Sequence, residues 1–309
     1  MQIQALLQEL YERYQGLAEG NVARYIPELA RFDPKLFAIG IMTTSGDFYG
    51  IGDVEQHFTL QSMSKPFTYG LVLEERGRDE VLRYVGVEPT GQSFNSIILD
   101  EKSGRAYNPM VNSGAIAVAS LIRGADAAER SKRMLHMFSQ YAGRALTFDL
   151  PTFLSERENG HRNRAIAHLM KNFNMLEGDL NEALELYFQQ CSVLVNIKDI
   201  ATMAATLAHR GINPITQQQA LQPKYVRDIL SVMLTCGMYD MSGWWAYRIG
   251  IPSKSGVSGG IWGVVPNRMG IAVFSPPLNE HGHSVRGIQV FTDLADQLRL
   301  HVFEVLDNL

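Results

Sequence analysis

The stretch "LQSMSKPFTYG", residues 60–70, contains the feature on which the fold prediction depends. Ser62 and Lys65 are three positions apart, at the end of an apolar run and directly before Pro66. Proline is tolerated in the first turn of a helix but clashes deeper inside one, so residues 62–65 are predicted to form the tight start of a helix. In such a turn, often 3₁₀-like, positions i and i+3 nearly eclipse, which brings the Ser62 hydroxyl and the Lys65 amine within reach of each other.

This pair is either a nucleophile with its base, or a capping serine beside an unrelated exposed lysine. A free lysine with a pKa of about 10.4 is deprotonated in only about one molecule in a thousand at neutral pH. Lys65 therefore serves as a base only if desolvation or a nearby cation lowers its pKa. Leu60, Met63 and Phe67 provide apolar surroundings. An S-x-x-K pattern arises by chance in roughly half of chains with this composition, so a second motif is needed.

The second motif is "KSGVSGG", residues 254–260, directly before a late hairpin. S-x-x-K followed by K-[ST]-G on a late strand is the order seen in serine acyl enzymes of the β-lactamase and penicillin-binding group. The S-D-N motif that normally stands between them is absent; "SFN" at residues 93–95 and "VNSG" around Asn112 are the candidates to supply a cleft-facing amide. Its absence argues against a β-lactam or peptidoglycan role.

Two strand-rich segments enclose a helical block. "LFAIGIMTTSGDFYGIGD", residues 36–53, reads as a hairpin with its turn at "TSGD", and "SGGIWGVVP" with "MGIAVFSP" reads as a second one around "NR". Between them the apolar residues keep a 3.6-residue period. We predict an α/β (α+β) fold in which 1–61 and 240–309 form an antiparallel sheet covered by the terminal helices, and 62–239 forms a mainly helical lobe, together one catalytic domain. The default ligand site is the cleft between the lobes.

Composition restricts the classes of partner. The 309 residues are 46% hydrophobic and 19% charged, with a net charge of −4 and a pI near 6.1, so no positive field attracts nucleic acid or an acidic membrane. No apolar run approaches the roughly 18 residues of a membrane-spanning helix. The amphipathic, acid-containing start "MQIQALLQELYERYQG" is unlike a secretory signal, so a cytoplasmic location is expected. Cys191 and Cys236 are isolated thiols in apolar contexts and are interpreted as core residues.

The sequence closely resembles one family, the serine-dependent glutaminases. These enzymes have a β-lactamase/transpeptidase-like fold and hydrolyse L-glutamine to L-glutamate and ammonia. The matching stretches occur in order across nearly the whole chain: "ARYIPELA", "LQSMSKP", "FNS", "YNPMVNSGAIA", "FLSERENGHRN", "YFQQCSV", "MAATLAHRGINP", "TCGMYDMSG", "KSGVSGGI" and "SPPLNEHGHSVRG".

The resemblance implies a role for particular residues. Ser62 is the nucleophile that becomes acylated, Lys65 its neighbouring base, and Tyr239 the second candidate for proton transfer. The backbone N–H groups of Ser62 and Val257 are placed to receive the oxyanion. The resemblance also implies that the protein is a homo-oligomer, specifically a tetramer, and that its small-molecule substrate is L-glutamine. The substrate-binding set that the resemblance gives is Tyr25, Ser62, Asn112, Glu156, Asn163, Tyr187, Tyr239 and, through its backbone, Val257.

Several of these residues also have an ordinary structural interpretation. Glu156 either binds the substrate α-ammonium or belongs to a solvated helix face in "SERENGHRNR". Asn163, expected in the first turn of the helix after Gly160, either bonds the α-carboxylate or caps that helix. Tyr187 lies on an apolar helical stripe typical of a core. Tyr239 follows a helical stripe and a candidate C-cap glycine, so it is expected at a helix end, where a functional hydroxyl is more plausible.

No metal or cofactor is expected. His281 and His283 in "NEHGHS" form an H-x-H in a polar loop without a third ligand nearby, and no G-x-G-x-x-G or P-loop follows a strand. Two alternatives to a glutaminase remain: another serine amidase or esterase of the same fold, or a catalytically silent amino-acid-binding protein.

Overall fold

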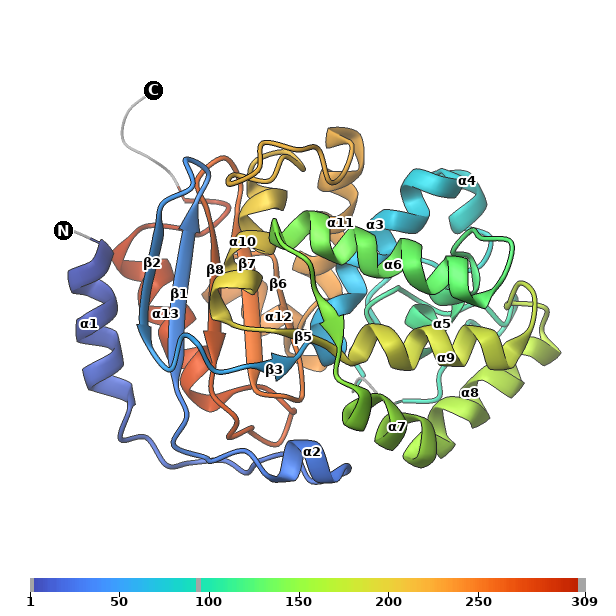
Figure 1. The fold of residues 1–309 in the computed structure, drawn as a ribbon, viewed down its shortest axis with the longest axis horizontal. Helices are drawn as coiled ribbons and strands as arrows, with labels where there is room; N and C mark the ends of the chain where they lie inside the picture. The colour runs from blue at the N-terminus through green and yellow to red at the C-terminus, as the bar shows by residue number, and fades with distance from the viewer. Residues whose placement is uncertain (1–2, 93–95, 305–309) are drawn as a thin grey trace.

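A five-stranded antiparallel sheet lies beside a group of helices in the computed structural model, which describes residues 3–92 and 96–304 (Figure 1). The strand order is β2-β1-β8-β7-β6. Both predicted hairpins are present, and Ala38–Thr43 of the first pairs with Met269–Phe274 of the second. The "SFN" amide considered from the sequence lies outside the described residues. The strands are β1 (Ala38–Thr43), β2 (Phe48–Gly52), β6 (Ser253–Ser255), β7 (Gly260–Val265) and β8 (Met269–Phe274).

Both faces of the three central strands, β1, β8 and β7, are buried, which explains why these strands read as continuous apolar runs. Ile39 and Ile41 of β1 pack with α1 (Ile3–Tyr14) and α13 (Val285–Gln297) in one cluster. Ala38 and Met42, which alternate with them, belong to a second cluster. The predicted covering of the sheet by the terminal helices is confirmed for the first face. The second face is covered by α10 (Ile197–Ala208), from the middle of the chain.

The close approach of α10 to the sheet depends on a glycine. A Cβ atom at Gly270 of β8 would lie 2.3 Å from the backbone nitrogen of Ala205 and 2.4 Å from the carbonyl oxygen of Ala201. Any side chain there would push α10 off the sheet. Helix α10 belongs to the predicted helical lobe, residues 62–239, yet it packs on the sheet. We propose the two lobes, 1–61 with 240–309 and 62–239, as folding units.

Most of the remaining helices lie beside the sheet, on the right in Figure 1. A small sheet, ordered β3-β5-β4, connects the two sides; its strands of two or three residues are too short to leave a sequence signal. Its strands are β3 (Phe58–Thr59), β4 (Thr147–Phe148) and β5 (Val193–Val195). The helices are α2 (Pro27–Ala30), η1 (Gln61–Ser64), α3 (Lys65–Arg76), α4 (Arg78–Val81), α5 (Asn112–Ser120), α6 (Ala127–Ala142), α7 (Leu150–Asn159), α8 (His161–Asn172), α9 (Leu180–Cys191), α11 (Pro223–Cys236), η2 (Tyr239–Met241) and α12 (Ser242–Arg248).

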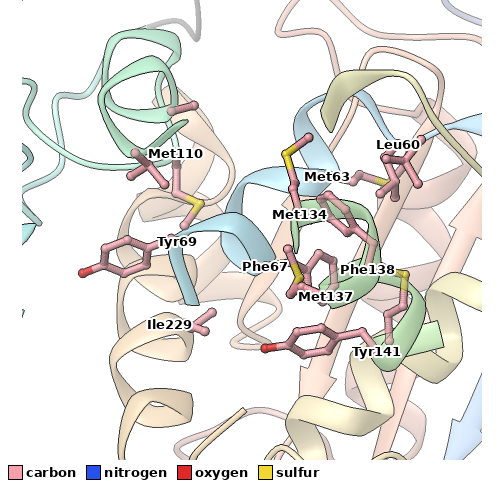
Figure 2. Packing of buried hydrophobic residues seen from close by; sticks show 14 of the residues in the cluster. Leu60, Met63, Phe67, Tyr69, Met110, Met134, Met137, Phe138, Tyr141 and Ile229 are labelled. Atoms are coloured by element: carbon pink, nitrogen blue, oxygen red, sulfur yellow. The ribbon is translucent and has the colours of Figure 1, made fainter. Parts of the chain in front are cut away.

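The quoted stretch folds as its proline predicts. Residues Gln61–Ser64 form the 3₁₀ turn η1, and Pro66 stands in the first turn of α3. Figure 2 shows Phe67 of α3 packed among Met63, Met134 and Phe138. Its ring is also stacked on Trp262 of β7, with 4.7 Å between centroids, so the start of α3 is fixed to both the helices and the sheet. Among the helices of the described ranges, none combines the length and the apolar character needed to cross a bilayer.

Candidate active site

A cavity of about 290 Å³ opens where η1, the β6–β7 loop and the helices meet. Seven of the residues predicted to bind substrate line it, each from a different element or loop. Tyr239 is absent from this lining and lies against Ser62 instead. The lining residues are Tyr25, Gln61, Ser62, Asn112, Glu156, Asn159, Gly160, Arg162, Asn163, Tyr187, Cys191 and Val257.

The turn that carries Ser62 is held from both sides. The N–H of Leu60 donates to the carbonyl of Val193 at 2.9 Å, and the indole of Trp262 donates to the carbonyl of Met63 at 3.2 Å. Gln61 has φ of 50°, in the left-handed region that non-glycine residues rarely adopt. Such a conformation persists where surrounding contacts impose it, and it occurs often at functional sites. Ser62 itself is buried apart from its face on the cavity.

Lys65 is buried beneath this turn with 1% of its surface exposed, so the exposed-lysine interpretation is excluded. Its amine donates to the carbonyl of Met110 at 3.0 Å and to Oδ1 of Asn112 at 2.7 Å. Burial lowers the pKa of Lys65 to about 7. Among the described contacts its amine has no hydrogen bond to Ser62. Two donated bonds are the number that an uncharged amine makes, which leaves its lone pair available.

Tyr239 faces Ser62 from η2 and is surrounded by two lysines. Its ring centroid is 5.6 Å from Nζ of Lys65 and 3.9 Å from Nζ of Lys254. Burial raises the pKa of the Tyr239 phenol above its ordinary value, and its hydrogen bond with Ser62 opposes the rise. Burial, with the charge of Lys65, lowers the pKa of Lys254 well below its ordinary value. The phenol therefore holds its proton at a pH where Lys65 begins to lose one.

The β6–β7 loop brings Val257 close to Ser62. A Cβ atom at Gly260, the first residue of β7, would lie 2.3 Å from Cε of Met63, so a side chain there would have to displace the Met63 side chain. Within the described residues, the backbone N–H groups of Ser62 and Val257 donate to no other protein group. Two unused donors at the wall of a cavity are the arrangement that binds a developing oxyanion.

A carboxylate also lines the cavity. Glu156 is 5% exposed, so its interpretation as part of a solvated face is wrong. The Tyr25 hydroxyl donates to Oε1 of Glu156 at 2.5 Å and lies 3.0 Å from Oε1 of Gln61. Burial raises the pKa of Glu156, and the hydrogen bonds from Tyr25 and Gln61 oppose the rise. A buried anion with hydrogen-bond donors around it is suited to a cationic ligand group.

Two amides connect the cavity to Lys65. Asn112, at the start of α5, accepts from Lys65 and donates through Nδ2 to Oδ1 of Asn163 at 3.0 Å. Asn163 lies in the first turn of α8, as predicted, and its side chain makes no cap bond there. Tyr187 of α9 is 3% exposed and is therefore a core residue that also lines the cavity.

Comparison with known proteins identifies the family to which this site belongs. A family model described as Glutaminase matches residues 20–303. The chain belongs to the glutaminase family. It is 60% identical to a glutaminase of Trichormus variabilis over 97% of this chain and 90% of that protein, and 54% identical to one of Microcystis aeruginosa over 97% and 88%.

Solved structures agree with this assignment and confirm the β-lactamase-like fold class. The structure described as "Probable glutaminase ybaS" has a TM-score of 0.95 at 43% identity, covering 98% of both chains. Mglu in its glutamate form has a TM-score of 0.94 at 41% identity over 99% of this chain and 72% of that one. Because the glutaminase match extends over nearly the whole chain, the prediction made from the ten sequence stretches is confirmed.

Sequence reasoning missed some residues at the site of this glutaminase. Lys254 was noted only as part of "KSG", yet its amine lies against the Tyr239 ring. Gln61 was not singled out, although it directly precedes Ser62. Cys191 was interpreted as core; it is buried and also lines the cavity. The K-S-G motif was the available signal for Lys254, and adjacency to Ser62 was the signal for Gln61, whereas Cys191 is brought to the cavity by tertiary packing.

The two loop histidines diverge in the structure of this glutaminase. His281 is partly exposed and pairs with Asp240, with 2.7 Å between Nδ1 and Oδ2. His283 is fully buried and contacts Ser255 and Met238 instead. Within the described residues, no group of three histidine, cysteine or acidic side chains is arranged to hold a metal ion.

Proposed function

We propose that this glutaminase hydrolyses L-glutamine to L-glutamate and ammonia through an acyl-enzyme on Ser62. The observation that carries the proposal is the burial of the Lys65 amine next to the turn that carries Ser62, which itself lines a cavity of about 290 Å³. An amine with a pKa of about 7 is substantially unprotonated at neutral pH and can accept the serine proton.

The substrate is a zwitterion, and each of its charges has a matching group. Glu156 provides the anion for the α-ammonium, with Tyr25 holding one carboxylate oxygen in place. Asn163 and Asn112 provide amide groups for the α-carboxylate and the side-chain amide. Tyr187 supplies part of the cavity wall. These contacts orient the side-chain amide toward Ser62, which is the main contribution that binding makes to the rate.

Acylation begins when the Ser62 hydroxyl attacks the side-chain amide carbon and its proton passes to Lys65. The oxygen of the amide becomes an oxyanion and accepts hydrogen bonds from the N–H groups of Ser62 and Val257. The carbon–nitrogen bond then breaks. Tyr239 donates its proton to the departing nitrogen and recovers one from Lys65, so the proton lost by Ser62 leaves with ammonia. The raised pKa of the buried phenol supports its role as a donor in this step.

Deacylation repeats these steps with water in place of the serine. Water attacks the glutamyl ester, its proton passes to the Lys65 amine, and the ester oxygen of Ser62 regains a proton as glutamate leaves. The same base and the same oxyanion donors serve both halves of the reaction, as required when the second step mirrors the first.

The test is an assay of ammonia released from L-glutamine, with L-asparagine as the comparison. Ammonia release from glutamine with glutamate as the second product supports the proposal. Labelling by a fluorescent penicillin would support another serine amidase or esterase of this fold. Glutamine binding without turnover would support a silent amino-acid-binding protein, and either result without ammonia release contradicts the proposal.

We also propose an oligomeric state and a cellular location for this glutaminase. The family resemblance supports a homo-oligomer, specifically a tetramer, and a cytoplasmic location. Trp244 and Tyr247 of α12 are 45% and 85% exposed, an apolar surface compatible with a contact between copies. Light scattering of the purified protein tests the tetramer, since a monomer mass at micromolar concentration contradicts it. Cell fractionation tests the location.

A further inference from the structure

His283 is buried at the point where three segments meet. It follows β8 in the loop that leads to α13, and none of its surface is exposed. Its Nδ1 lies 2.8 Å from the Ser255 hydroxyl of β6, and its Nε2 lies 3.2 Å from the carbonyl oxygen of Met238. The sequence suggested an ordinary polar loop here. A fully buried imidazole that connects the K-S-G strand to the residue before Tyr239 requires another explanation.

The hydrogen bonds fix the tautomer of this ring. The Met238 carbonyl can only accept, so Nε2 of His283 carries the hydrogen. Nδ1 is then the acceptor when the ring is neutral, and the Ser255 hydroxyl donates to it. Burial and the nearby charge of Lys254 lower the pKa of His283 to about 3, so the ring stays uncharged at neutral pH. His283 thus acts as a fixed pair of hydrogen-bonding atoms with no proton to exchange.

The segment that His283 holds has a strained backbone. Tyr239 has φ of 54°, in the left-handed region, where a bulky residue is an outlier. A conformation of this kind persists only when surrounding contacts over-determine it. His283 provides two such contacts, the bond to the Met238 carbonyl and a near-parallel stack on the Tyr239 ring, with centroids 6.0 Å apart and 13° between the planes.

We propose that His283 is a positioning residue for glutamine hydrolysis: it locks the Met238–Tyr239 turn onto Ser255 and so holds the Tyr239 hydroxyl against Ser62. The inference rests on the proposed role of Tyr239 in proton transfer. His283 touches neither the cavity nor the reacting atoms. Its contacts reach the reaction only through Tyr239 and through β6, the strand that carries Lys254.

Two variants of His283 separate positioning from packing. His283→Leu keeps an apolar side chain of similar length and removes both hydrogen bonds. We expect kcat to fall by about 30-fold, with KM for glutamine within about threefold, since misplacing a reacting group by about 1 Å costs on the order of 10²-fold. His283→Gln places an amide N–H near the position of Nε2, so it should recover most of that loss. Equal activity of the two variants, or a change in KM alone, would overturn the proposal.

The neighbouring histidine supplies the matched control. His281 is in the same loop and is partly exposed; its ring bonds to the side chain of Asp240 in η2, whereas the ring of His283 bonds to the backbone carbonyl of Met238. We expect His281→Leu to leave kcat within about twofold of wild type, as is usual for a surface substitution. A loss equal to that of His283→Leu would mean that the whole loop matters rather than His283, which would refute the inference.

A double-mutant cycle with Tyr239→Phe provides the decisive readout. If His283 acts through the Tyr239 hydroxyl, His283→Leu should cause little further loss of kcat once that hydroxyl is gone. Full additivity of the two losses overturns the His283 proposal while leaving the proposed function intact. If Tyr239→Phe alone leaves kcat unchanged, the proposed role of Tyr239 is wrong instead.

Ser255→Ala covers the case in which His283→Leu does not fold. This smaller change removes the hydroxyl that donates to Nδ1 and leaves the imidazole in place. We expect kcat to fall by about fivefold at nearly constant KM, and the loss to vanish in the Tyr239→Phe background. An unchanged kcat, or a loss that persists in that background, contradicts the proposal.

Discussion

Lys65 donates a hydrogen bond of 2.7 Å to the side chain of Asn112, which in turn donates to Asn163 at 3.0 Å. The proposed base and the proposed substrate contacts are therefore parts of one hydrogen-bonded chain. Asn112 is an amide, so it accepts from Lys65 without adding a negative charge beside it. An uncharged acceptor allows burial to keep the pKa of Lys65 low.

Asn112→Asp is expected to raise the pKa of Lys65. A carboxylate in place of the amide oxygen favours the ammonium form, because an opposite charge within about 4–6 Å raises the pKa of an amine by roughly 1–3 units. The pH at which kcat/KM reaches half its maximum should move upward by that amount. The pH profile of the variant measures the shift. A midpoint that stays at the wild-type value would show that Lys65 does not control the profile.

The wild-type profile itself is expected to rise with pH. The amine is active when deprotonated, and burial lowers its pKa to about 7, so kcat/KM should increase through pH 7 and level off above it. Glu156 also titrates with a raised pKa, and Glu156→Gln serves as the control because it removes that carboxylate and should keep the rise near pH 7. A wild-type profile that is flat between pH 6 and 8 contradicts the assignment of Lys65.

Ser62→Ala is expected to abolish turnover and to leave the fold and glutamine binding largely intact. The hydroxyl faces the cavity, and the turn is held by backbone bonds at Leu60 and Met63 that the substitution does not touch. Loss of the attacking group costs several orders of magnitude in kcat. An ammonia-release assay measures the loss of turnover, and calorimetry measures whether the variant still binds glutamine. Residual activity above about a hundredth of wild type would remove Ser62 as the nucleophile.

Glu156→Gln is expected to weaken recognition of the α-ammonium group. The substitution preserves the shape of the side chain and removes its charge, and the loss of a charge-assisted bond costs about 1.5–3 kcal/mol. The value of kcat/KM for glutamine should fall by the corresponding factor, roughly 10- to 150-fold. The matched control is Glu158→Gln, an exposed carboxylate on the same helix, which should have no effect. Unchanged kcat/KM in Glu156→Gln would sink the assignment.

Local sequence rules predicted the parts of the fold that local physics determines. Pro66 placed the start of α3 at the observed position, because a proline is tolerated in the first turn of an α-helix and clashes deeper inside one. The two hairpins were predicted from their turn residues and apolar runs, and both are present. The three-stranded sheet was missed, because strands as short as Phe58–Thr59 contain too few residues to show a period.

The site was harder to predict because its contacts are distant in sequence. Lys65 meets Asn112 across 47 positions, and Tyr25 meets Glu156 across 131. No spacing rule reaches that far, and these residues were named through the family resemblance. His283 shows the limit most clearly, since "NEHGHS" reads as a polar loop and only its packing against Ser255 and Met238 reveals that it is buried.

The last prediction concerns which group takes the proton of Ser62. From the sequence, Lys65 and Tyr239 were both candidates for proton transfer. The structure separates them, because burial lowers the pKa of the amine to about 7 and raises that of the phenol. We therefore expect Lys65 to accept the proton during acylation and Tyr239 to donate one to the leaving nitrogen.

Single-turnover experiments distinguish these roles. Lys65→Ala should remove nearly all formation of the glutamyl-enzyme, because it removes the amine whose pKa of about 7 makes it available as a base at neutral pH. Tyr239→Phe keeps the ring and removes only the hydroxyl, so it should preserve glutamine binding and lower kcat by about 10²- to 10⁴-fold, the usual contribution of a general acid. If Lys65→Ala still forms the glutamyl-enzyme at near the wild-type rate while Tyr239→Phe does not, the two roles are reversed, and the hydrogen bond between Ser62 and Tyr239 marks the true base.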